Sequence, residues 1–216
     1  MKYFLNVVSA SLVIFMFGIS GFVSFEQNIA RASTSSSTNV VVTLNVTTGI
    51  SVTANSASLT MSNPLSISQN TSVGSSTFTV ITNDILGYTL GLNATTSPAM
   101  QGSGVAYNIP DLAATPATFS VGAGTSAFGF SAYGSDVTAS KWGTDGSCGS
   151  SGTLLSNAMK YAGFTTSATT TASRTATTTP TGVTTTVCYG VAQGTSFFVP
   201  AGTYTATIVA TATTLP

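Results

Sequence analysis

The chain has 216 residues, of which only five are basic and five acidic, and it contains no histidine. No basic patch is available to neutralise phosphates, which excludes nucleic acid as a partner. With so few charges, solubility has to come from Thr, Ser and Asn side chains. That composition suits an exported chain that associates with itself.

We expect the first 32 residues to be a signal peptide. Lys2 precedes an apolar run without charge up to Glu26, and Ala30 and Ala32 satisfy the small-x-small rule for cleavage after Ala32. The run is also long enough to be retained as an N-terminal anchor helix, in which case it is the chain's attachment to a membrane. A pilin-type leader is a third interpretation, because Phe22 and Glu26 have the pilin spacing, but polar residues follow Glu26.

Cleavage would leave 184 residues, enough for one domain with its own core. We therefore divide the chain into a signal peptide or anchor (1–32), a flexible polar tail (33–38) and a single domain (39–216). Within that domain, residues 134–182 interrupt the strand pattern and are predicted to be a long loop insertion. Their Thr-rich run is expected to be solvated loop, and residues 154–164 are the best candidate for one short helix, ending near Gly163.

Two cysteines, Cys148 and Cys188, lie in the mature chain. An even pair in an exported protein predicts a disulfide, with two free thiols as the alternative. The bond would close a loop of 40 residues, worth roughly 4 kcal/mol in the chain-entropy model.

Apolar and polar residues alternate with a period of two along most of the mature chain, as in half-buried antiparallel strands. Gly, Pro and Asn-rich turns separate the segments, and strands at near-regular spacing predict an all-β, antiparallel β-sandwich of Ig-like or fimbrial-like kind. The clearest segments are 76–82, 87–94, 127–133, 182–192 and 202–213.

A further alternating segment follows the polar tail. Val40, Val42, Leu44 and Val46 would share one face of a strand over residues 39–47. Two interpretations remain open. The strand either opens its own domain, or acts as a donor strand that adds to the sheet of a neighbouring molecule.

The loop insertion also holds the candidate ligand residues Tyr133, Asp136, Trp142 and Asp145. An aromatic ring could stack on a sugar while an Asp accepts from its hydroxyls, and the two Asp residues with backbone carbonyls could hold calcium. The alternative is structural: Trp142 covers the end of the sandwich beside the disulfide. Calcium is the one cofactor that the loop suggests.

The sequence argues against an enzyme. Without histidine, no Ser-His-Asp or Cys-His arrangement can form. No Glu follows Glu26, and Asp84 and Asp111 occupy positions that suit turns rather than a carboxylate pair. The sequence has no GxSxG nucleophile motif and no glycine-rich phosphate loop. We therefore predict no catalytic, cofactor-binding or metal residues.

Four segments resemble Thr/Ser-rich secreted proteins of uncultivated, reduced-genome bacteria. "VITNDILGYTLGLNATTSPAM" is similar to their TNxxxGYTLTLxA stretch, and "TFSVGAGTSAFGFSAYGSDV", "ASRTATTTPTGVTTTVCYGV" and "AGTYTATIVATAT" are similar to further segments. The last one also resembles the closing strand of WxL-type cell-wall proteins and of some fimbrial subunits. The resemblance implies an exported β-sandwich of the cell surface without an established enzymatic role. Trp142 is followed by Gly143 and Thr144, so the Trp-x-Leu motif is absent.

Together these observations predict a secreted, extracellular structural protein of the cell surface. It would associate with itself or with other cell-surface components, and β-strand addition is the mode of association that we expect. The alternative is an adhesive or carbohydrate-binding module that binds a glycan with the Trp142 loop.

Overall fold

A computed structural model describes residues 40–149 and 158–216. The predicted signal peptide or anchor helix and the polar tail lie outside the described residues. The chain divides into two units between Asn45 and Val46, and the second, Val46–Pro216, is compact and contains all the strands described below.

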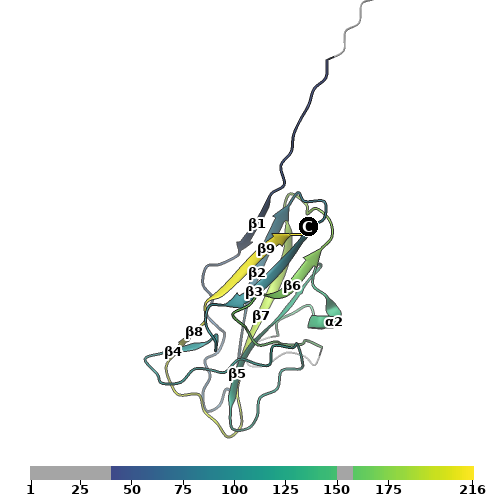
Figure 1. Ribbon diagram of the computed structural model, residues 1–216. Helices are drawn as coiled ribbons and strands as arrows, with labels where there is room; N and C mark the ends of the chain where they lie inside the picture. The colour runs from purple at the N-terminus through teal and green to yellow at the C-terminus, as the bar shows by residue number, and fades with distance from the viewer. Residues whose placement is uncertain (1–39, 150–157) are drawn as a thin grey trace, which may run out of the picture. The chain divides into compact units, whose positions relative to one another are not determined.

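The regular structure of the second unit is almost entirely antiparallel strands, which long loops connect (Figure 1). A four-stranded sheet has the order β1-β2-β7-β5, a three-stranded sheet has the order β6-β3-β9, and β4 pairs with β8. The strands are β1 (Ile50–Ala54), β2 (Thr71–Thr82), β3 (Tyr88–Ala94), β4 (Gln101–Ser103), β5 (Ser126–Gly134), β6 (Thr169–Arg174), β7 (Val183–Gln193), β8 (Thr203–Thr205) and β9 (Ile208–Thr214).

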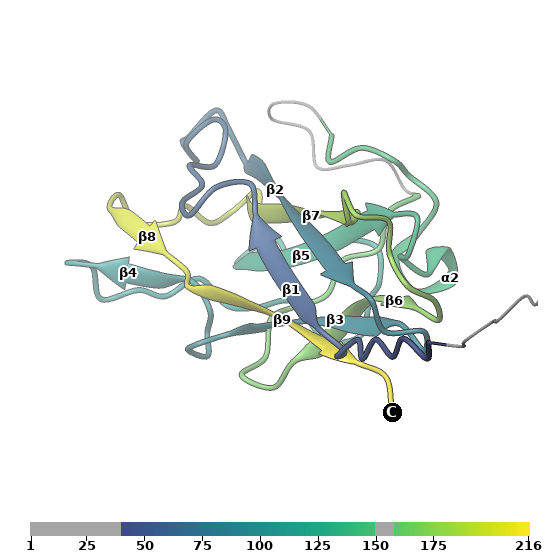
Figure 2. The same cartoon turned by 90° about the horizontal axis from the view of Figure 1, so that it is seen from above.

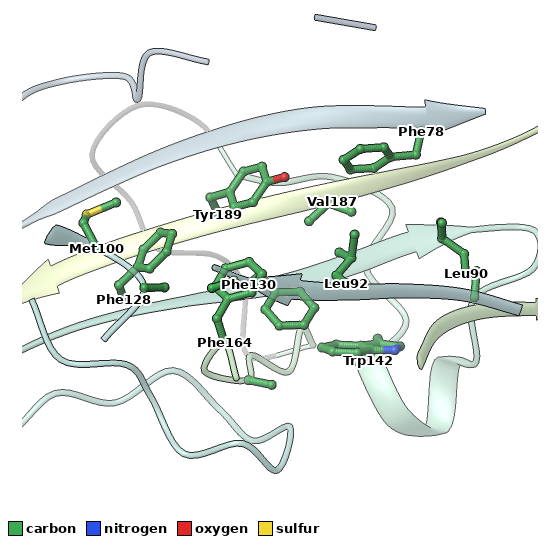
Figure 3. Packing of buried hydrophobic residues seen from close by; sticks show 14 of the residues in the cluster. Phe78, Leu90, Leu92, Met100, Phe128, Phe130, Trp142, Phe164, Val187 and Tyr189 are labelled. Carbon is green, nitrogen blue, oxygen red and sulfur yellow. The ribbon is translucent and has the colours of Figure 1, made fainter. Parts of the chain in front are cut away.

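The predicted antiparallel β-sandwich is confirmed, and the period-two pattern explains it. In β3, buried Tyr88, Leu90 and Leu92 alternate with half-buried polar or small residues, so one face packs on the core. The large sheet contributes its own alternating side chains, such as Val80 and Phe130. The two sheets therefore share one apolar core (Figure 3).

The strand edges on the two sides of the sandwich differ in whether another segment covers them. On one side, the free edge of β5 is covered: Leu112 N and Ala162 N donate to the carbonyls of Phe128 and Phe130 at 2.8 Å. On the other side, β1 and β9 lie next to each other (Figures 1 and 2). Within the described residues, β1 and β9 are the edge strands of their sheets on that side. Covering segments thus close the sandwich at β5, whereas β1 and β9 contact each other without pairing, and neither pairs with a further strand on that side among the residues described.

The predicted loop insertion 134–182 contains more regular structure than expected. Its Thr-rich run was expected to be loop, but residues Thr169–Arg174 form β6, which pairs with β3. Thr is β-branched and suits a pleated strand, and Ala172 packs into the core. The prediction of a solvated loop is therefore wrong for these residues.

The short helix also lies elsewhere. α2 spans Ala139–Trp142, ahead of the segment 154–164 that was expected to be helical. The described part of that segment forms isolated bridges instead, with Tyr161 pairing with Ala117 and Ala162 with Phe130. Its apolar residues are fixed by backbone pairing with neighbouring segments rather than by a helical turn.

Candidate functional site

The residues predicted as a donor strand form no strand in this structure. We call residues 40–46 the N-terminal apolar segment. Residues 40–49 carry no assigned secondary structure, and β1 begins only at Ile50. Val40, Val42, Leu44 and Val46 are 75–86% exposed, and Val41 is 89% exposed. Five large apolar side chains within seven residues are therefore in contact with solvent.

One residue fixes the backbone where this segment meets the sandwich. The side-chain amide of Asn83 donates to the carbonyl of Thr47 at 2.8 Å, and its oxygen accepts from Gly49 N at 2.7 Å. Asn83 follows directly after β2, which is the strand that pairs with β1. The chain is therefore held at its entry to β1, up to Thr47.

The second unit contains a groove of about 960 Å³, which we call the apolar groove. Its floor is made of buried core side chains, including Phe78, Met100, Phe128 and Tyr189, three of which gather at one end of the cluster in Figure 3 (Met100, Phe128, Tyr189). Its two rims are the segment 54–61, which follows β1, and the segment 200–208, which contains β8. The volume is near the upper end of typical ligand pockets.

All lining residues of the apolar groove are uncharged. Its polar side-chain groups are hydroxyls, and two buried ones already pair with each other: Ser76 Oγ and Tyr189 Oη lie 2.8 Å apart. The pKa of the Tyr189 phenol lies above its ordinary value because burial raises it, and the hydrogen bond with Ser76 offsets only part of that increase. The groove is thus suited to an uncharged, mainly apolar occupant.

Sequence reasoning missed this groove, because its lining comes from segments far apart in the chain. The rim residues Leu59, Met61 and Leu65 lie between strands, where no period-two pattern marks them. The one available signal was their apolar character in a stretch predicted to contain turns.

The predicted ligand loop is used for structure. Asp136 Oδ2 accepts from the Tyr88 hydroxyl at 2.8 Å, and its Oδ1 lies 3.2 Å from an Arg174 nitrogen. Tyr133 packs with the cluster on the outer face of β7. Asp145 lies near Tyr161, where its charge adds to the effect of burial in raising the pKa of that phenol. Asp136 and Tyr133 thus make contacts within the fold.

Trp142 is fully buried. The centre of its ring lies 5.0 Å from that of Phe130 (Figure 3). The Lys141 ammonium lies 5.0 Å from the centre of the indole. Lys141 also donates to the carbonyl of Thr170, which fixes it over the ring. The indole is therefore not available to stack on a sugar, and the structure favours the structural role that the sequence left open for it.

The predicted disulfide between Cys148 and Cys188 is confirmed, with the two Cα atoms 5.2 Å apart. Cys188 lies on the outer face of β7, where Met159 and Tyr161 cover it. The bond therefore fastens the segment after α2 to the large sheet. Its loop of 40 residues is the one that the sequence indicated.

No group of three or more His, Cys, Asp or Glu side chains able to hold a metal occurs in the residues described. Asp84 caps a turn by accepting from Leu86 N at 2.8 Å, as predicted. Asp111 does not sit in a local turn: its Oδ2 accepts from Ala99 N at 3.0 Å, and burial raises its pKa.

The fold defines the protein as an antiparallel β-sandwich with a disulfide on its outer face. Comparison with known proteins adds no family: no family model, no curated protein and no solved structure matches the chain. In the ranges 40–149 and 158–216, no helix has the length and apolar character needed to cross a bilayer.

Proposed function

We propose that this protein is a secreted, non-enzymatic structural protein of the cell surface that associates with copies of itself by β-strand addition. The observation that carries the proposal is the N-terminal apolar segment. It has the alternating pattern of a half-buried strand, yet its apolar side chains are exposed.

Association would remove this apolar surface from water. Full burial of one Val or Leu side chain is worth about 1.5–3 kcal/mol relative to exposure, so several of them supply a substantial driving force. Part of that gain is offset by ordering the segment. An exposed apolar patch in a soluble protein is a common mark of an interaction site.

The sandwich also offers strand edges to pair with. Edge strands usually carry charges, prolines or bulges that discourage pairing. β1 and β9 contain no charged residue and no proline. The two strands are rich in hydroxyl side chains, and no charge in them discourages backbone pairing with another chain.

The disulfide supports the secreted location. Such bonds persist in oxidising compartments and are rare in the cytosol, and this one joins a buried cysteine to a half-buried one. With the predicted signal peptide, it favours export over retention in the cytoplasm.

The test compares the chain starting at Ser33 with a chain starting at Thr48, by light scattering and negative-stain microscopy. We expect the longer chain to form oligomers or filaments and the shorter one to be a folded monomer, since Val46–Pro216 is a compact unit. Monomers of both chains at high concentration would refute self-association.

A matched pair of substitutions distinguishes strand addition from non-specific hydrophobic association. Leu44→Asp and Thr43→Asp introduce the same charge at adjacent, exposed positions. In a strand, neighbouring side chains point to opposite faces, so only Leu44→Asp should abolish assembly. Equal effects of the two substitutions would contradict the addition of an amphipathic strand.

A further inference from the structure

Resting on that proposed function, we infer that the apolar groove of a second copy is the receptor for the N-terminal apolar segment. The proposal fixes both partners of the contact: residues 40–46 of one molecule lie between segments 54–61 and 200–208 of the next. The segment offers exposed apolar side chains, and the groove offers an uncharged, mainly apolar lining beside a strand edge that no described strand pairs with.

The first match is in charge and polarity. Residues 40–46 carry no charge, and neither does any lining residue of the groove. Seating the segment therefore buries no ionised group, which is the usual obstacle to filling an apolar site. Val40, Val42, Leu44 and Val46 would face the floor residues, while Val41, Thr43 and Asn45 would face outward.

The second match is in backbone geometry. β8 and β9 follow each other with only Ala206 and Thr207 between them, and residues 203–206 and 208, from β8 to the start of β9, line the groove. One edge of this run pairs with β4 and β3, and the described strands leave its other edge without a partner. A strand of seven residues spans about 23 Å at 3.3 Å per residue, enough to run along that edge.

The third argument concerns why the occupant comes from another molecule. To enter the groove of its own chain, the segment would have to reverse at residues 47–49 and run back along β1. β9 already lies beside β1, and the Asn83 side chain holds Thr47 and Gly49 at the entry to β1. Intramolecular insertion therefore requires breaking contacts that the folded chain makes, whereas insertion into a second copy does not.

A complementation experiment with the full chain tests the inference. Leu44→Asp removes the donor and leaves the groove intact. Ala206→Asp places a charge in the groove, where the half-buried Ala206 lines it, and leaves the donor intact. Thr207→Asp, at the next, exposed position, is the matched control. Circular dichroism and thermal unfolding establish that each variant folds.

We expect Leu44→Asp and Ala206→Asp each to weaken self-association at least tenfold, and Thr207→Asp to leave it near the unmodified level. Mixing the two defective chains should give one-to-one heterodimers that grow no further, because only one functional donor and one functional groove remain. If Ala206→Asp does not fold, Ala57→Asp on the opposite rim replaces it, since Ala57 is exposed.

The outcomes separate this inference from the proposed function. If Leu44→Asp abolishes assembly but neither groove variant affects it, the segment binds elsewhere: the inference fails and self-association stands. If the mixed chains do not pair although each folds, the inference fails as well. If the unmodified full chain stays monomeric at all concentrations, both proposals fail.

A photo-crosslinking residue at position 44 locates the contact directly, in a mixture of isotopically light and heavy full chains. Mixed-mass cross-links to the floor residues Phe78, Met100, Phe128 or Tyr189, or to residues 54–61 or 200–208, are the expected result. Cross-links within one chain would show insertion into its own groove, and cross-links to β6 would indicate another edge. Either result would overturn the assignment of the groove of a second copy.

Discussion

The hydroxyl of Tyr88 donates a 2.8 Å hydrogen bond to Oδ2 of Asp136, a carboxylate whose side chain is only 6% exposed. Arg174 pairs with the other carboxylate oxygen at 3.2 Å. Three elements are joined in this way: β3 through Tyr88, the turn after β5 through Asp136, and the end of β6 through Arg174. The contact fixes the small sheet to the end of β5.

We expect Tyr88→Phe to destabilise the fold. Hydrogen bonds to charged groups contribute about 1.5–3 kcal/mol, and the substitution leaves a mostly buried carboxylate with one partner fewer. Tyr161→Phe is the matched control, because no hydrogen-bond partner of the buried Tyr161 hydroxyl occurs among the residues described. Urea unfolding should show a lower free energy of unfolding for Tyr88→Phe and little change, or a gain, for Tyr161→Phe. The reverse order would contradict the role assigned to the Asp136 contact.

The same phenols predict a loss of stability in alkali. Burial raises the pKa of Tyr88, Tyr161 and Tyr189 above the ordinary value, and for Tyr88 the hydrogen bond with Asp136 raises it further. The unfolded chain then loses these protons near pH 10 while the folded chain keeps them. Stability should be independent of these groups below pH 10 and fall as the pH rises above it.

Urea midpoints measured between pH 8 and pH 12 test this expectation. Tyr161→Phe removes one buried phenol and should make the alkaline decline less steep, because one group fewer is linked to unfolding. If the alkaline decline in stability is equally steep in Tyr161→Phe, the Tyr161 phenol has the same pKa in the folded and unfolded chains, which contradicts the expectation.

Much of the fold follows from local pattern, and the exceptions have a physical cause. β3 and β7 were predictable because one face of each packs on the core, which a period of two records in the sequence. β6 was not, since its Thr-rich sequence resembles a solvated loop and only pairing with β3 orders it. The apolar segment 40–46 has a strand pattern and no strand, because no sheet edge of the described chain pairs with it.

The candidate site was predictable only in part. The alternation of apolar and polar residues identified the N-terminal apolar segment, because which face of a strand a side chain occupies depends only on its position along that segment. The apolar groove depends on where Leu59, Tyr189 and Tyr204 meet in space, and these residues come from three distant segments. The same limit applies to Trp142, which looked available in the sequence but packs against Phe130 in the core.

Removal of the disulfide should lower stability without abolishing the strand pairing of the large sheet. A loop of this length contributes roughly 4 kcal/mol in the chain-entropy model, with measured values usually nearer 2–4. The double variant Cys148→Ala with Cys188→Ala is preferable to Ser, because a hydroxyl at the buried Cys188 position would lack a partner. Urea unfolding of this variant, beside the unmodified chain with and without reductant, gives the difference. No change on reduction would contradict the assigned contribution.

Two glycines should respond differently to substitution by alanine. A Cβ at Gly163 would lie 1.8 Å from the carbonyl oxygen of Leu112, whereas a Cβ at Gly124 meets nothing within 4 Å. Gly163→Ala must therefore displace the segment that covers the edge of β5, where Gly163 N donates to the carbonyl of Ala113. We expect a clear fall in melting temperature for Gly163→Ala and none for Gly124→Ala. Equal melting temperatures would mean that this covering segment is loosely held.

Trp142 is the single tryptophan of the chain, so its fluorescence reports directly on the end of the core that it occupies. Because the indole is buried against Phe130, its emission should be blue-shifted, poorly quenched by iodide and unaffected by soluble sugars. Trp142→Ala should cost about 3–5 kcal/mol of stability, the range for removing a large aromatic from a core. Trp142→Phe, which keeps an aromatic ring there, should cost less. Saturable quenching or a spectral shift on adding an oligosaccharide would instead favour a carbohydrate-binding module.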